Sequence, residues 1–132
     1  MVEQRFVLIV ESDPAARKQM KSVLAEMGAG EVEADSLDAA CDLAEGLARD
    51  ARAPKLIVVR VTLPDGNAVQ VFDRLAVLFP HAHYVLVSHY PKHLLFSMPG
   101  FASLRAEFLQ AAFTDDEFRK VVGRVLGRSN GV

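Results

Sequence analysis

The chain has 132 residues, the length of one domain, so a single core must account for the whole sequence. Hydrophobic residues make up 51% and charged residues 24%, which excludes disordered, collagen-like and coiled-coil classes. Lys and Arg number 15 against 17 Asp and Glu, and the net charge of -2 provides no overall attraction to nucleic acid or anionic membrane. The lone Cys41 excludes an internal disulfide, and every apolar run is far shorter than a membrane span. We therefore expect a cytoplasmic domain that binds neither nucleic acid nor membrane directly.

The first predicted elements are a buried strand and an amphipathic helix. After its first residue, the segment Arg5–Val10 is continuously apolar, as in a strand buried on both faces of a parallel sheet. Asp13 followed by Pro14 favours a helix start, and helical spacing of apolar residues continues to about Met27. Gly28 suits the left-handed residue that ends such a helix.

The next two predicted elements are a weaker strand and a second helix. Residues Glu31–Ala34 alternate weakly in hydrophobicity and predict an edge or second strand. Apolar spacing from Leu37 to Ala48 predicts a helix that begins at Asp35 or Ser36. Cys41 lies on its apolar stripe, so we interpret it as a small core residue rather than a reactive thiol.

The middle of the chain repeats this alternation. Leu56–Val59 and Tyr84–Val87 are wholly apolar and predict buried strands. Leu63–Asn67 predicts a turn, and Ala68–Phe79 has helical spacing that Pro80 ends.

The last predicted pair is a strand at Phe108–Leu109 and a helix opened by the capping-box spacing of Thr114–Glu117. We expect this helix to end near Leu126, with residues 127–132 as a polar tail. Five alternating strand and helix units predict an α/β fold, with five parallel strands in a doubly wound, flavodoxin-like sheet between two helical layers.

In such sheets a site lies beyond the carboxyl ends of the strands, where the strand order reverses. Glu11 and Ser12 follow the first strand, Arg60 the third and Ser88 the fourth. No glycine follows the first strand, so a phosphate-wrapping loop for a dinucleotide or flavin is disfavoured.

Three motifs carry a resemblance to a known family. The segments Val7–Pro14, Pro54–Arg60 and Leu63–Gly66, together with the element order, resemble the receiver domains of bacterial two-component response regulators. The resemblance covers about residues 5–126 and implies one receiver-like domain over residues 1–132. In that family, two adjacent acids hold Mg²⁺, an Asp that ends the third strand accepts a phosphoryl group, and a Ser or Thr, an aromatic residue and a Lys-Pro pair complete the switch.

This sequence departs from the family at most of those positions. The residues that occupy them are Glu11 and Ser12 at the acid pair, Arg60 at the phosphoacceptor, Ser88 at the hydroxyl, Phe108 at the aromatic position, and Ala111-Ala112 at the Lys-Pro pair.

Taken together, these departures alter both the phosphorylation chemistry and the binding of Mg²⁺. A guanidinium stays protonated and has no lone pair with which to attack phosphorus, so Arg60 cannot accept a phosphoryl group. A pocket with one carboxylate and a cation is under-liganded and repulsive for Mg²⁺, so we expect no metal and no other cofactor. We predict that Arg60 instead forms an internal ion pair with Glu11, with Ser12 as a second candidate contact; the alternative is an exposed Arg60 at a strand end.

Two further positions have simpler structural interpretations. Without a phosphoryl group to attract it, Ser88 is expected to satisfy a backbone group at its strand end. Phe108 is most simply a core residue.

Four histidines, His81, His83, His89 and His93, fall close together, but no thiol or carboxylate lies near them in sequence, which disfavours a metal site.

The segment His89–Phe101 replaces the family's fourth helix. Its two prolines should shorten that helix. In the family this helix forms the usual partner or dimer surface with the fifth strand and fifth helix. The candidate interface residues here are Tyr90, His93, Phe96, Met98 and Phe101. The alternative is that half of the large apolar side chains simply cover the sheet.

The sequence therefore favours a non-enzymatic, phosphorylation-independent pseudo-receiver that signals by binding a protein partner or a second copy of itself. The alternative is a sensor in which the pocket around Arg60 binds an anion or nucleotide, since guanidinium suits phosphate. An enzyme has little support, because no nucleophile and base can be paired.

Overall fold

The computed structural model describes residues 6–130, and the side chains of residues 6–127. Its strands are β1 (Phe6–Val10), β2 (Gly30–Ala34), β3 (Leu56–Arg60), β4 (Thr62–Leu63), β5 (Gly66–Asn67), β6 (His83–Ser88) and β7 (Glu107–Gln110). Its helices are α1 (Pro14–Glu26), α2 (Leu37–Arg49), α3 (Ala68–Leu78), α4 (Lys92–Leu95) and α5 (Asp115–Asn130). Arg5, the predicted first residue of β1, lies outside the described residues.

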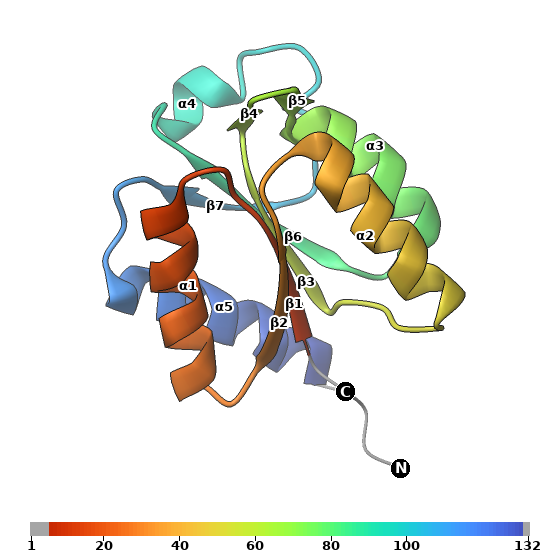
Figure 1. Cartoon of the computed structure of the whole chain (residues 1–132). Coiled ribbons are helices and arrows are strands. Elements are labelled where there is room, and N and C mark those ends of the chain that lie inside the picture. Colours follow the sequence, from red (N-terminus) through yellow and green to blue (C-terminus); the bar gives the residue numbers. More distant parts are fainter. Residues whose placement is uncertain (1–5, 131–132) are drawn as a thin grey trace.

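Five of these strands form one parallel sheet in the order β2-β1-β3-β6-β7 (Figure 1). The chain moves outward from β1 to β2, then crosses back to β3 and on to β7, so the order reverses between β1 and β3. This is the predicted doubly wound sheet. Strands β4 and β5 form a separate antiparallel hairpin where the sequence predicted only a turn.

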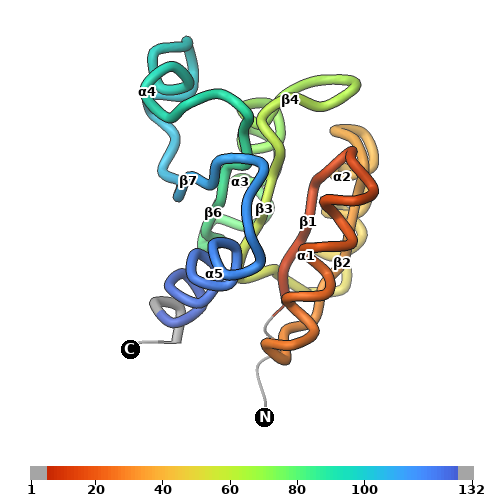
Figure 2. Tube along the Cα trace, turned by 90° about the vertical axis from the view of Figure 1, so that its left-hand side faces the viewer, coloured from red at the N-terminus to blue at the C-terminus, as the bar shows by residue number. Residues whose placement is uncertain are grey.

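Helices cover both faces of the sheet, as the two views show (Figures 1 and 2). Helices α1 and α5 pack on one face, through an apolar cluster that includes Met20, Leu24 and Phe118. Helices α2 and α3 pack on the other face, where Leu47 and Leu75 are buried. Strands β1 and β3 alternate between the two clusters, because successive side chains of a strand point to opposite faces. Their uniformly apolar sequences follow from this double burial.

Side-chain caps fix where the helices begin. Asp13 accepts a hydrogen bond from Ala15 N at the start of α1, and Ser36, one of two predicted alternatives, caps α2. Thr114 and Glu117 form the predicted capping box of α5, with Glu117 N to Thr114 Oγ1 at 3.1 Å and Thr114 N to Glu117 Oε1 at 2.8 Å.

Helix ends agree with the sequence at α1 and differ at α5. Gly28 has the positive φ of 73° that was expected beyond α1. Helix α5 continues to Asn130 rather than ending near Leu126, so most of the predicted polar tail is helical. The extra residues are polar but helix-compatible, and Gly127 interrupts a helix only weakly.

The shortest helix is α4, a single turn of four residues. Pro91 occupies its N-cap position and Pro99 follows soon after it, which agrees with the predicted shortening. Within the described residues, no helix combines the length and the apolar character that crossing a membrane requires.

Candidate functional site at the carboxyl edge of the sheet

Parallel pairing brings Glu11 and Arg60 together. Val10 of β1 lies opposite Val59 of β3, so the residues that follow them, Glu11 and Arg60, are neighbours at the carboxyl edge of the sheet. Arg60 Nε donates to Glu11 Oε2 at 2.5 Å, forming an ion pair. The Glu11 side chain is completely buried and that of Arg60 is 15% exposed. The predicted pair is therefore present, in an environment with little water to screen it.

Further hydrogen bonds hold Glu11 and the segment that follows it. Glu11 Oε2 also accepts from Asp13 N at 3.0 Å, and Glu11 N donates to Ala34 O at 3.0 Å. The Arg17 Nη1 donates to Glu11 O at 2.7 Å, a contact that sequence reasoning missed. Glu11 Oε1 is buried with no hydrogen-bond partner among the described residues. The same carboxylate oxygen, Glu11 Oε2, thus accepts the hydrogen bond of the ion pair and the one that holds the turn before α1.

A second basic group lies beside this pair. Arg17 Nε contacts Glu33 Oε1 at 3.1 Å, and Lys21 Nζ contacts Glu33 Oε2 at 2.8 Å. The hydrogen bond from Lys21 is the main reason that the pKa of Glu33 is lowered. The negative charge of Glu33 is thus balanced by two basic side chains of α1.

The other predicted pocket residues have structural contacts. Ser88 is buried, and its Oγ accepts from Tyr90 N at 2.9 Å, the backbone role expected at a strand end. Ala111 N donates to Ser88 O at 2.8 Å, and the Ala111-Ala112 peptide bond is cis. Ser12 is half-buried at the turn between β1 and α1.

The side chains at this edge offer few oxygen ligands for a divalent cation such as Mg²⁺. Octahedral coordination needs several oxygen ligands, whereas Glu11 offers one carboxylate that is already paired with a cation. Across the part of the chain that the structure describes, no three His, Cys, Asp or Glu side chains come together to hold a metal ion.

Phe108, at the position of the family's aromatic switch, is half-buried rather than fully in the core. Its ring centroid lies 6.5 Å from that of Phe96, with the planes tilted by 57°. Phe96 and Phe108 both pack on the apolar cluster beneath α2 and α3. The two rings connect the segment His89–Phe101, which we call the α4 segment, to β7.

The candidate interface residues divide into three groups by exposure. Tyr90 is 46% exposed and His93 is also exposed, so both are available on the surface. Phe96 and Met98 are half-buried against the core. Phe101 is only 6% exposed and belongs to the core, which corrects its assignment to the interface.

Sequence reasoning also missed one exposed apolar residue on this surface. Leu94 is 43% exposed, whereas its neighbour Leu95 is fully buried. Both are leucines in one helical turn, so hydrophobicity alone could not separate them. We call Tyr90, His93 and Leu94 the α4 surface.

Asp65 has a role that its turn sequence only partly indicated. Its carboxylate accepts from Leu37 N at 2.8 Å and from Asp38 N at 2.9 Å, at the first turn of α2. These two backbone hydrogen bonds, the one from Asp38 first, lower the pKa of Asp65. The β4–β5 hairpin thus caps a helix that precedes it by almost 30 residues of chain.

No protein-family model and no curated protein matches this sequence. Many solved structures match the fold. A two-component response regulator from Clostridium difficile superposes with a TM-score of 0.80 and 17% identity, covering 97% of this chain and 100% of its own. A putative response regulator from Chloroflexus aurantiacus gives 0.77 and 18%, covering 96% and 100%. A receiver domain from Clostridium thermocellum gives 0.78 and 12%, covering 96% and 97%.

Similarity at this level of identity establishes the fold. The chain has the flavodoxin-like α/β fold of response regulator receiver domains along nearly its whole length. The expectation that came from the resemblance of Val7–Pro14 and Pro54–Arg60 is confirmed at the level of architecture.

Proposed function

We propose that this domain is a phosphorylation-independent signalling module that acts by binding another protein, without catalysis of its own and without Mg²⁺. The receiver fold supports a signalling role, because receiver domains transmit signals through their surfaces. We further propose that it works in the cytoplasm, where receiver domains receive and pass on signals.

The ion pair between Arg60 and Glu11 is the observation that carries this proposal. It occupies the end of the third sheet strand, where a receiver would present its phosphoacceptor carboxylate. A guanidinium cannot take up a phosphoryl group, and its positive charge beside Glu11 opposes a divalent cation. The simplest function for such a domain is therefore to bind a partner through a surface that forms without phosphorylation.

The proposed contact surface is the face formed by α4, β7 and α5. Tyr90 and Leu94 expose large apolar area there, and β7 is an edge strand of the sheet. Aromatic and aliphatic side chains next to an open strand edge favour protein association. The partner is either another signalling protein or a second copy of this chain.

The anion-sensor alternative needs a free guanidinium at Arg60. Arg60 Nε is already bonded to Glu11, so an incoming phosphate would have to compete with a buried carboxylate. This pairing favours the binding module over the sensor. Thermal-shift measurements with phosphorylated metabolites distinguish them, because a ligand that binds only the folded state raises Tm.

Photo-crosslinking tests the proposed surface directly. A photoreactive phenylalanine analogue replaces Tyr90 in one variant and Val77 in a matched control, because Val77 is an 80% exposed apolar residue on α3, away from the face. We expect specific crosslinks, to a partner or to a second copy, from position 90 and none from position 77. Crosslinks from position 77 alone, or from neither position, would contradict the proposed surface.

A further inference from the structure

The charges of this chain are distributed unevenly along its sequence. The chain contains 17 Asp and Glu, yet none of them falls in the stretch from Arg74 to Ala106. This acid-free stretch includes all of α4 and the exposed Tyr90 and Leu94 of the α4 surface. The α4 surface is therefore apolar and carries no negative charge of its own.

Three exposed cations surround this surface. Lys92 is the first residue of α4, Arg105 precedes β7, and Lys120 lies on α5. None of them takes part in an ion pair among the residues that the structure describes. Lys120 precedes Arg124 by about one helical turn, and Arg124 contacts Glu107 of β7 at 2.9 Å, so both basic side chains lie on the β7 side of α5.

The acids of this face lie on β7 and in the first turn of α5. Each accepts a hydrogen bond from a described donor: Glu107 from Arg124, Asp116 from Arg119, Asp115 from Gln19 and Glu117 from Thr114 N. These acids are thus engaged within the fold, whereas the three cations are available to a partner. Such a face is complementary to an acidic surface.

Helix α2 provides an acidic surface of this kind. Three exposed acids lie about one turn apart along it, and we call this set the α2 face: Asp38, Asp42 and Glu45. Their carboxylates form no ion pair with another described residue. Arg49 is the single basic residue of α2. The α2 face therefore has the charge that the α4 surface lacks.

The two surfaces lie at opposite edges of the sheet. Helix α2 packs near the β2 edge, whereas the α4 surface is on the side of the β7 edge (Figures 1 and 2). One copy of the chain can therefore use both surfaces at once. A symmetric dimer through two α4 surfaces would instead bring the same cations together, and like charges across an interface oppose association.

We propose that the α4 surface binds the α2 face of a second copy of this chain, so that copies associate head to tail. The inference rests on the proposed function and names its partner. Lys92 would meet the carboxylates of the α2 face, and Tyr90 and Leu94 would pack against Leu43, which is half-buried beside Asp42. Contacts between unlike surfaces build rings or filaments rather than closed dimers.

Sedimentation velocity measures this association. We expect the average mass of the 14.4 kDa chain to rise with concentration up to about 1 mM in about 50 mM salt, and to fall at about 500 mM salt, because salt screens exposed charges. A chain that stays monomeric, or association that is insensitive to salt, would overturn the proposal.

Charge reversal identifies the two surfaces. Lys92→Glu and Asp42→Lys should each weaken association about tenfold, because like charges then face each other. Mixing the two variants should restore it, because each supplies the surface that the other has lost. Lys18→Glu, the same change at an exposed lysine of α1, is the matched control and should have no effect. Equal effects of Lys92→Glu and Lys18→Glu, or a mixture that stays monomeric, would contradict the assignment.

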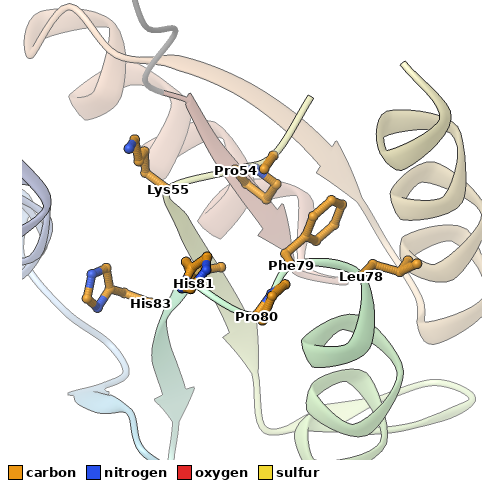
Figure 3. A pocket seen from close by; sticks show the side chains of 9 residues that line it. Pro54, Lys55, Leu78, Phe79, Pro80, His81 and His83 are labelled. Atoms are coloured by element: carbon orange, nitrogen blue, oxygen red, sulfur yellow. The ribbon is translucent and has the colours of Figure 1, made fainter. Parts of the chain in front are cut away.

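Amide NMR of the labelled domain locates the contact. On dilution, amides of α2 and α4 should shift together. Those of residues 79–82 should not shift, because they line a hollow of about 410 Å³ at the amino edge of the sheet, away from both surfaces (Figure 3). Shifts confined to that hollow would overturn the proposal.

The photoreactive analogue at position 90 separates failure of this inference from failure of the proposed function. We expect its crosslinks to reach residues 37–49 of a second copy. Crosslinks to a different protein, from a chain that stays monomeric, would overturn the inference and leave the proposed function standing. Absence of any crosslink from position 90 would contradict both.

Discussion

Arg60 and Glu11 make their contact where little solvent can reach either charge, and this sets what the pair contributes. Removing two charges from water is costly, so a buried ion pair adds little net stability compared with apolar residues of similar size. Breaking it on one side is different, because the remaining charge stays buried without compensation. The completely buried Glu11 is the member at risk.

Arg60→Met should therefore lower the free energy of unfolding by about 3 kcal/mol, since it leaves the Glu11 carboxylate buried and unpaired. Adding Glu11→Gln should recover most of that loss, because the amide oxygen still accepts from Asp13 N and no buried charge remains. Urea denaturation of the four proteins in this double-mutant cycle measures the coupling. A nearly neutral Arg60→Met would show that Arg60 acts only as a surface side chain.

Asp65 should stabilise the fold in a pH-dependent way. Its pKa in the folded state is lowered by the hydrogen bonds from Asp38 N and Leu37 N, from an ordinary value of 3.8. The contribution is thus complete above about pH 4 and is lost as the pH falls through the lowered pKa. The destabilisation caused by Asp65→Asn should be clear at neutral pH and shrink in acid.

Ser36→Ala is the matched comparison for this effect, because Ser36 caps the same helix with an uncharged hydroxyl. Its effect on the urea midpoint should not change with pH across the same range. Equal pH dependence of the two variants would contradict the assignment of the titration to Asp65.

At the scale of elements, the β4–β5 hairpin connects the starts of two helices. Asp65 bonds to the first turn of α2, while Asn67 and Gln70 form the capping box of α3. Gly66 lies between them, where an added Cβ would meet Leu37 Cδ2 at 2.7 Å and Gln70 Oε1 at 2.6 Å. An alanine here would therefore force the ends of both side chains to shift.

Gly66→Ala should destabilise the domain by about 1–3 kcal/mol, the usual range for overpacking. Gly46→Ala is the control, because Gly46 lies inside α2 and its Cβ would come no closer than 3.7 Å to Arg49 Nη2. That change should be stabilising by up to about 1 kcal/mol through helix propensity. Chemical denaturation measures both, and a neutral Gly66→Ala would show that Leu37 and Gln70 move aside freely.

The side chains of the α4 segment differ in whether they are exposed or pack on the core. Tyr90→Ala should change stability by less than about 0.5 kcal/mol, because the side chain is largely exposed. Phe96→Ala should cost about 2 kcal/mol, because it removes a half-buried ring that packs on Phe108. Thermal and urea unfolding of the two variants check this difference. Equal losses would mean that Tyr90 also supports the fold and is unsuitable for mapping the proposed surface.

Much of the element pattern was predictable from local sequence. Buried parallel strands read as short apolar runs, and Asp13, Asn67 and Thr114 are residues that cap helices by contacts within a few positions. The hairpin was not predicted, because pairs as short as Thr62–Leu63 and Gly66–Asn67 leave no periodicity to detect.

The site was predictable where chemistry restricts the choice. A cation beside a carboxylate at neighbouring strand ends predicts a pair, and the structure has it. Burial within the α4 segment was not predictable, because Phe101 and Tyr90 are both large and aromatic but one enters the core. The cap from Asp65 to α2 joins residues far apart in sequence, and only the folded chain brings them together.

At the scale of the whole molecule, the proposed functions lie at different places on one sheet. The Arg60 pair is at the carboxyl edge, and the α4 surface is on the side of β7. A change at one place can therefore be tested while the other serves as an internal reference.

The most direct test of the central claim is the amide NMR spectrum of the labelled domain with and without Mg²⁺ and beryllofluoride, a mimic of the acyl phosphate. We predict unchanged peaks, because the Arg60–Glu11 pair occupies the position of the phosphorylation chemistry. Shifts clustered at Glu11, Arg60 and Ser88 would contradict this, since they would mean that the carboxyl edge still binds an anion or a metal ion.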